Sequence, residues 1–456
     1  MVARDAEIAA LTRKVDELTQ LVLALKEQLN RNSGNSGKPP SSDTPNQRAE
    51  RQGKGATGGK RGGQPGHTGS KRELVPPEQV NEFKPLFPSE CENCWASLPQ
   101  TPSSVQRFQM VELPPLKTHV IEWLRHCVTC PSCNHETWAS TATIPSSPFG
   151  PRLSAVIGLF TGVYHLSRRA AVSLTADVLG IDISLGAVSA VEKRVSEAVK
   201  PAVEEAWARL DEAPVKHTDG TSWFQAGVLC ALWTIATSVV TVFKILSDGK
   251  GTTLAPLFGK QLGILVSDRG TALKFWAMER RQICWAHLLR KAISFSERDG
   301  PAGALGRELL DYITIIFAHW DGVKAGKLSR DEFRELMVPV RKHVELLLER
   351  GQAAKWTHVS GSCEDMLEHR AALWTFVDNE GVEPTNNHAE RELRAFVLWR
   401  KRSFGTQSVR GNLFAERVMT VAHTARKQNK NVLEFLTACY TAARSGSTPP
   451  SLFLAA

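Results

Sequence analysis

Three acidic residues that are far apart in the sequence could together carry a metal-dependent reaction. Asp219 ends a short run with an extended pattern, residues 215–218, and Asp268 follows the apolar run of a buried strand at 263–267. Two strands that each present a carboxylate can share a metal site, although a single Asp after a strand is usually a turn former or a helix cap. Glu390 lies in a segment with helical periodicity, and it would face the core if Leu393 packs there. The alternative is a solvated helix in which Glu390 pairs with Arg394.

Five cysteines between positions 91 and 133 have the spacing of metal ligands. Two C-x-x-C turns supply the four thiolates of a tetrahedral zinc site, and such a closed set leaves no open position for catalysis. The nine cysteines are an odd number, and the first residues do not show the pattern of a secretory signal, so we expect reduced thiols and a metal rather than a disulfide framework. We therefore expect one structural zinc ion, bound by Cys91, Cys94, Cys130 and Cys133, with Cys127 and His126 as alternative ligands.

Positive charge is concentrated in two segments. The net charge of the chain is +9, of which residues 48–72 carry +6 and residues 391–410 carry +5, so the rest is slightly acidic. Such clusters favour contacts with DNA phosphates. The alternatives are a solubilising tether for the first segment and a solvated helix face for the second. The candidate DNA-binding residues are Arg48, Arg51, Lys54, Lys60, Arg61, Lys71, Arg72, Arg391, Arg394, Arg400, Lys401 and Arg402.

The first thirty residues carry a heptad pattern that predicts a helix. Its apolar positions alternate spacings of three and four, at Ile8, Leu11, Val15, Leu18, Val22, Leu25 and Leu29. We expect a coiled coil that joins copies of the chain, and the alternative is an amphipathic helix packed on its own domain. Residues 31–80 are rich in Gly, Ser, Pro, Lys and Arg, which predicts a flexible, disordered basic linker.

Residues 146–205 have the pattern of successive helices. Gly180 is suited to end one helix and Ser184 to begin the next. Two helices joined by so short a turn could form a helix-turn-helix that binds DNA, although many helical hairpins share this pattern.

Strands follow from residue 215, including two that continue an antiparallel meander at 227–238 and 239–246. The uncharged run 226–243 is as long as a membrane span, but its Thr, Ser and Val content favours two buried strands. Between the second and third acids the pattern predicts helices at 305–319, 330–350 and 363–376, and therefore a helical insertion.

In combination, these motifs resemble the insertion sequence 66 family of bacterial DDE transposases. The residues that carry the resemblance are Asp219-Gly220-Thr221, the box Cys284-Trp285-Ala286-His287, the helix start Asn386-Asn387-His388-Ala389-Glu390-Arg391, and the basic stretch Arg400-Lys401-Arg402-Ser403-Phe404-Gly405. The Asn-Ser-Gly run at residues 32–43, the segment Gly62-Gly63-Gln64-Pro65-Gly66-His67 and the cysteine cluster also match that family. Arg269-Gly270 and Thr385 differ from its usual pattern without removing a catalytic group.

The resemblance implies an RNase H-like core in which Asp219, Asp268 and Glu390 bind two Mg²⁺ or Mn²⁺ ions. The implied activity is cleavage of DNA at transposon ends to expose a 3′-OH, which is then joined to target DNA. The alternatives are a catalytically inactive DNA-binding protein of the same architecture and a metal-dependent nuclease without strand transfer. The C-x-x-H box at Cys284 and His287 offers too few ligands for a metal by itself, which favours a packed strand–helix junction.

The implied fold is a multidomain α+β protein. Its partners would be transposon-end and target DNA, further copies of the chain in a dimer or larger assembly, and accessory proteins of the same element. We expect a cytoplasmic, nucleoid-associated protein that does not bind a membrane. The expected segments are a coiled-coil helix (1–30), a linker (31–80), a zinc-binding module (81–145), a helix-turn-helix-like module (146–205), the first part of the core (206–298), a helical insertion (299–380), the last part of the core (381–445) and a tail (446–456).

Overall fold

The computed structural model describes residues 12–15, 18, 29–36, 43–47, 49, 72–260 and 262–453. Contacts divide the chain into a smaller unit, Ala49–Val120, and a larger unit made of Met1–Arg48 and Ile121–Ala456. Most of the expected coiled coil and linker lies outside the described residues. The described part of the smaller unit is mostly exposed, extended chain with one short turn of 3-10 helix, η2 (Pro77–Gln79).

The larger unit contains a mixed five-stranded sheet with the strand order β5-β4-β3-β6-β7. Strands β3, β4 and β5 are antiparallel, as the sequence predicts, whereas β3, β6 and β7 are parallel neighbours. The turn Ala226-Gly227 between β3 and β4 has positive φ at both residues, which suits the twist of a tight hairpin. The strand bounds are β3 (Val215–Gln225), β4 (Val228–Ala236), β5 (Thr241–Leu246), β6 (Ile264–Ser267) and β7 (Arg281–Ile283).

Strand β3 is longer than the sequence pattern suggests. The expected strand ended before Asp219, but pairing with β4 continues from Asp219 opposite Thr234 to Gln225 opposite Val228. The fully buried Trp223 anchors this second half of β3 in a cluster with Leu232 and Phe243. The uncharged run 226–243 forms β4 and part of β5, and none of the described helices is long and apolar enough to cross a membrane.

Six helices share one core with part of the sheet: four precede the sheet in the sequence, and two follow α14 (Asn387–Ser403) near the C-terminus. Ser167 and Ser184 accept hydrogen bonds from Ala170 N and Ala187 N, so both begin helices as N-caps, and Gly180 ends the first in the left-handed conformation. These helices are α3 (Pro151–Gly158), α4 (Arg168–Leu179), α5 (Leu185–Ala198), α6 (Lys200–Asp211), α15 (Val409–Lys427) and α16 (Val432–Ser445). A π-helical turn, η3 (Leu159–Val163), extends α3.

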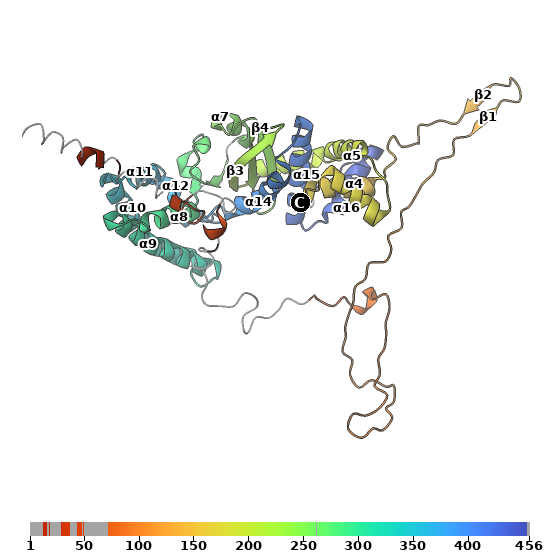
Figure 1. Cartoon of the computed structure of the whole chain (residues 1–456), viewed down its shortest axis with the longest axis horizontal. Coiled ribbons are helices and arrows are strands. Elements are labelled where there is room, and N and C mark those ends of the chain that lie inside the picture. The colour runs from red at the N-terminus through yellow and green to blue at the C-terminus, as the bar shows by residue number, and fades with distance from the viewer. Residues whose placement is uncertain are drawn as a thin grey trace, which may run out of the picture. The chain divides into compact units, whose positions relative to one another are not determined.

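The expected helix-turn-helix-like module at 146–205 has no core of its own. Helix α5 lies beside α4, α15 and α16 (Figure 1) and also packs against α3. Its Val195 belongs to the same buried cluster as Val418 and Leu436. The sequence pattern of two capped helices is therefore correct, but part of the apolar face of α5 is covered by α15 and α16, which lie more than 200 positions later in the chain.

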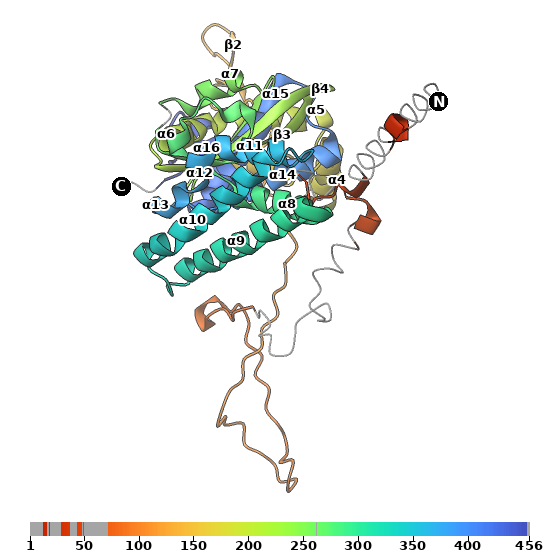
Figure 2. The same cartoon turned by 90° about the vertical axis from the view of Figure 1, so that its left-hand side faces the viewer.

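A second core belongs to the insertion between the second and third acids. Helices α9 and α10 lie side by side (Figures 1 and 2), and α8 packs on α9. The expected helix at 363–376 is three short helices, because the chain turns at His369 and again at Trp374. The bounds are α8 (Trp285–Ser296), α9 (Gly300–Lys324), α10 (Arg330–Ala353), α11 (Ser360–Glu368), α12 (Arg370–Leu373) and α13 (Thr375–Asp378).

Candidate active site

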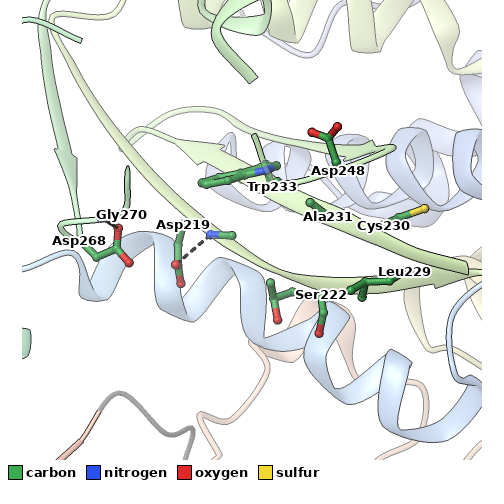
Figure 3. Close-up of a pocket in the computed structure, with 12 residues that line it drawn as sticks. Asp219, Ser222, Leu229, Cys230, Ala231, Trp233, Asp248, Asp268 and Gly270 are labelled. Carbon is green, nitrogen blue, oxygen red and sulfur yellow. Dashed lines mark hydrogen bonds between the residues drawn. The ribbon is translucent and has the colours of Figure 1, made fainter. Parts of the chain in front are cut away.

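Asp219 and Asp268 are brought together by the parallel pairing of β3 and β6. His217 of β3 is paired with Val266 of β6, and the two strands run in the same direction. Asp219 and Asp268 each come two residues after this pair, so they lie at the same level. Figure 3 shows both carboxylates at one end of a pocket. Each is held by a glycine amide, because Gly220 N donates to Asp219 Oδ1 and Gly270 N to Asp268 Oδ1, both at 2.8 Å.

Glu390 reaches the same region from α14 (Asn387–Ser403). The buried face of this helix packs on the sheet, with the Phe396 ring 5.5 Å from that of Trp223 and 4.8 Å from that of Phe243. Leu393 is also buried, which is the condition under which the sequence placed Glu390 on the face toward the core. The Glu390 carboxylate lies 3.9 Å from both His287 Nδ1 and Arg290 Nη2 of α8, whereas Arg394 is exposed.

Burial and neighbouring acids raise the pKa values of two of the three acids, Asp219 and Glu390. Burial, followed by the negative charges of Asp268 and Glu390, raises the pKa of Asp219 to about 7. Burial also raises the pKa of Glu390, and Asp268 adds to that effect while Arg290 opposes it. Asp268 and Glu390 are thus close enough to Asp219 for their charges to disfavour its ionised form. The structure thus gathers the three acids that the sequence singled out.

The pocket beside the two aspartates has a volume of about 420 Å³. Its walls combine polar groups with apolar side chains, and Trp233 covers Gly220 closely enough that an added Cβ would lie 3.0 Å from the indole ring. Glu390 is not one of the lining residues. The lining residues are Asp219, Gly220, Thr221, Ser222, Leu229, Cys230, Ala231, Trp233, Asp248, Gly249, Asp268 and Gly270.

Asn386 connects three of the elements around the site, a role that the sequence did not reveal. Its backbone N donates to Cys284 Sγ at 3.2 Å, and its side-chain Nδ2 donates to Thr218 O on β3 at 2.8 Å. An Asn at a helix start suggests a cap, but Asn386 makes no side-chain cap bond with α14. The only sequence signal was its position four residues before Glu390, which does not distinguish capping from bonding to a strand.

Arg281, on β7, supports the segment that carries Asp268. Its guanidinium is fully buried and donates to Asp268 O at 3.1 Å and to Ser267 Oγ at 3.3 Å. Burial lowers the pKa of Arg281, and Asp268 opposes that shift. A basic residue at the start of a short strand that leads into Ile283-Cys284-Trp285 is the sequence signal that could have identified it.

The C-x-x-H box lies where β7 meets α8. Cys284 is fully buried and is the N-cap residue of α8, so a packed strand–helix junction is present there as expected. Burial raises the pKa of the Cys284 thiol, against the opposing effect of backbone N–H groups from Asn386, His287 and Ala286. Burial lowers the pKa of His287 to about 4, with Arg290 contributing.

The candidate DNA-binding residues fall into three groups. Arg391, Arg394, Lys401 and Arg402 are exposed on or next to α14, and Arg72 is exposed in the smaller unit. Arg400 instead bonds to Thr221 and Ser222 of β3, so it holds α14 to the sheet. The remaining candidates lie outside the described residues: Arg48, Arg51, Lys54, Lys60, Arg61 and Lys71.

The two C-x-x-C pairs adopt the same local backbone. Trp95 N donates to Cys91 O and Cys91 N to Ala96 O, each at 2.9 Å, and Trp95 has positive φ. The second turn repeats this pattern after Cys130, with Asn134 at positive φ, and it lies within the hairpin of β1 (Cys127–Thr129) and β2 (Glu136–Trp138). Backbone N–H groups lower the pKa of the first cysteine of each turn. Cys91 and Cys94 belong to the smaller unit, and Cys130 and Cys133 to the larger.

Comparison with known families adds two matches. The sequence model of the transposase IS66 family matches residues 147–412, which include the three acids and most of the sheet and helices around them. A family of unknown function, DUF6444, matches residues 3–73. No curated protein sequence matches the chain.

Proposed function

Because the chain belongs to the IS66 family of transposases, we propose that it binds transposon ends, cleaves DNA there to expose a 3′-OH, and joins that 3′-OH to target DNA. The observation that carries the proposal is the convergence of Asp219, Asp268 and Glu390 from two parallel strands and a helix. The strand order β5-β4-β3-β6-β7, with three antiparallel strands followed by two parallel ones, supports an RNase H-like core.

The donor set fits divalent metal ions. Carboxylate oxygens are the ligands that Mg²⁺ and Mn²⁺ prefer. Neighbouring negative charges disfavour the ionised forms of Asp219 and Glu390, and bound cations would neutralise those charges. Two such ions bound by Asp219, Asp268 and Glu390 would activate the attacking water or 3′-OH and stabilise the leaving 3′ oxygen.

The other residues of the site position these acids and the DNA. The Gly220 and Gly270 amides orient Asp219 and Asp268. Asn386 ties the start of the Glu390 helix to β3 one residue before Asp219. The exposed Lys401 and Arg402, at the other end of that helix, are placed to contact phosphates, which positions the backbone without reading its sequence.

The test is cleavage of end-labelled transposon DNA by the purified full-length chain in Mg²⁺. Asp219→Ala, Asp268→Ala and Glu390→Ala are each expected to abolish cleavage while leaving DNA binding intact. Asp311→Ala, which removes an exposed acid of α9, is the matched control and should cleave normally. Normal cleavage by the Glu390 variant would show that this helix does not contribute to the site.

The products separate the three candidate activities. Strand-transfer products support the transposase, cleavage alone supports a nuclease, and binding without cleavage in either Mg²⁺ or Mn²⁺ supports a regulatory DNA-binding protein. The family membership and the presence of all three acids favour the first.

We also propose the structural zinc site at Cys91, Cys94, Cys130 and Cys133. The repeated backbone of the two turns supports it, because N–H groups directed at a cysteine sulfur stabilise the thiolate that zinc requires. Metal analysis should find one zinc ion fewer per chain in Cys91→Ser.

The proposed dimer depends on the heptads of residues 1–30. Deleting them should halve the mass measured by light scattering, and an unchanged mass would place the dimer interface elsewhere.

A further inference from the structure

Three potential metal ligands of different chemistry meet beside the acidic site. The ligand atoms of Cys284, His287 and Glu390 all lie within 4.8 Å of one another. They provide one sulfur, one imidazole nitrogen and one carboxylate oxygen. Glu390 is the only one of the three that the proposed DNA chemistry uses.

The fold produces this grouping from two helices. Cys284 is the N-cap of α8, and His287 follows three positions later, so both lie on the first turn and on the same side of it. Helix α14 supplies Glu390 from the opposite direction, and the bond from Asn386 N to Cys284 Sγ fixes its start against this turn. The C-x-x-H box alone has too few ligands, and the tertiary structure adds the third.

Two atoms in this group are buried without a hydrogen-bond partner in the described structure. They are His287 Nδ1 and Glu390 Oε1, which face each other at 3.9 Å. That distance is too long for a hydrogen bond between them. Buried polar atoms are normally paired, so this pair indicates a missing third species between them.

A cation of the zinc class fits the group better than Mg²⁺. Thiolate, imidazole and carboxylate together are a donor set that zinc accepts, and three protein ligands leave one position open. Mg²⁺ prefers oxygen ligands alone. The hydrogen bond from the Asn386 backbone N–H to Cys284 Sγ is also the kind of contact that supports a metal-bound thiolate.

We propose that Cys284, His287 and Glu390 bind a thiophilic divalent cation such as Zn²⁺, which competes with the catalytic Mg²⁺ ions for Glu390. The binding site follows from the geometry alone, whereas the competition rests on the proposed function of Glu390. Occupied, this site would hold Glu390 away from the reaction and make DNA cleavage sensitive to zinc.

The binding test uses Co²⁺ as a spectroscopic probe of the full-length chain, in excess Mg²⁺. Bound cobalt is counted by equilibrium dialysis, and a sulfur-to-cobalt charge-transfer band reports the thiolate. Wild type should bind one Co²⁺ more per chain than His287→Gln or Cys284→Ser, with a correspondingly stronger band. The control is Cys439→Ser, which alters another buried cysteine, in α16, and should bind as wild type does.

Equal cobalt counts in wild type and His287→Gln would overturn the site and leave a bridging water as the missing species. His287 is partly exposed, so its variant remains decisive even where Cys284→Ser fails to fold. Circular dichroism establishes which variants are folded.

The competition test measures zinc inhibition of cleavage at fixed Mg²⁺. The zinc concentration for half inhibition should rise at least tenfold in His287→Gln, and an unchanged value would overturn the competition. Asp219→Asn separates the zinc-class site from the proposed transposase activity, because it should lose cleavage yet keep the extra cobalt ion.

Discussion

At the scale of single residues, the surroundings of Asp219 disfavour the ionised form of its carboxyl group. Asp219 is partly buried near two other carboxyls, and its pKa of about 7 means that the folded protein binds a proton there more tightly than the unfolded chain does. Its contribution to stability is therefore fully present below pH 4 and is lost as the pH rises through about 7. A bound cation would offset this loss, which is why the same arrangement suits a metal site.

Asp219→Asn should stabilise the metal-free protein at pH 8. The amide keeps an oxygen that can accept from Gly220 N but carries no charge, and the gain is up to roughly 4 kcal/mol for a pKa shift of this size. Denaturant unfolding in EDTA measures it. The advantage should shrink at pH 5, and a variant no more stable than wild type at pH 8 would contradict the account.

Substitutions of the basic residues of α14 should affect either DNA binding or stability, depending on what each side chain contacts. Lys401→Ala and Arg402→Ala should weaken DNA binding for all sequences and lower the salt slope by about 0.9 for each phosphate that the variant no longer neutralises. Arg400→Ala should instead reduce stability, because its guanidinium bonds to Thr221 and Ser222. Salt-dependent binding and denaturant unfolding of the three variants check this difference. Equal salt slopes in wild type and Lys401→Ala would exclude a phosphate contact at that position.

At the scale of elements, helix α14 is fixed to β3 at both ends. Asn386 bonds to Thr218 at its start. Beyond its last turn, Gly405 has φ of 103° and lies so close to β3 that a Cβ would come within 2.1 Å of Phe224 O. Thr406 then pairs with the end of β3 through a bond from its N to Phe224 O. The direction in which Glu390 points depends on both attachments.

Gly405→Ala should destabilise the protein by several kcal/mol. An alanine at this φ has an unfavourable backbone conformation, which costs about 1 kcal/mol. Its Cβ would also collide with Phe224 O of β3, and relieving that collision would displace α14. Gly381→Ala is the matched control, because Gly381 also has positive φ but has nothing within 4 Å of an added Cβ. Equal losses in thermal unfolding would mean that the close approach to β3 does not matter.

At the scale of the whole molecule, distant parts of the chain build common cores. The helices before the sheet and the two that end the chain form one cluster, and the insertion forms another with β7 and α8. Asp268 and Glu390 are 122 positions apart in the sequence, but the insertion between them packs against β7 and α8 and the chain then returns to the sheet at α14.

A fragment of residues 146–205 should not fold alone. Its helix α5 buries Val188, Val191 and Val195, and the surfaces that cover this face include α15 and α16. Circular dichroism should show weak helicity without a cooperative thermal transition. Cooperative unfolding of the fragment would support an independent module instead.

Local patterns in the sequence determined the elements and the chemical candidates. Capping residues located α4 and α5, the uncharged run rich in Thr, Ser and Val located the antiparallel strands, and strand ends and motifs identified Asp219, Asp268 and Glu390. These signals are readable because caps, turns and periodicity depend on residues only a few positions apart. The heptad, the basic linker and the zinc ligand set remain predictions.

Tertiary structure alone decided which of these residues meet. The pairing of β3 with β6 sets Asp219 level with Asp268, and the packing of α14 turns Glu390 toward His287 rather than toward Arg394. Asn386 became a link between helix and strand instead of a cap, and a two-ligand box became a three-ligand group. Such contacts join residues up to about 170 positions apart, and they depend on strand register and helix packing that no local pattern encodes.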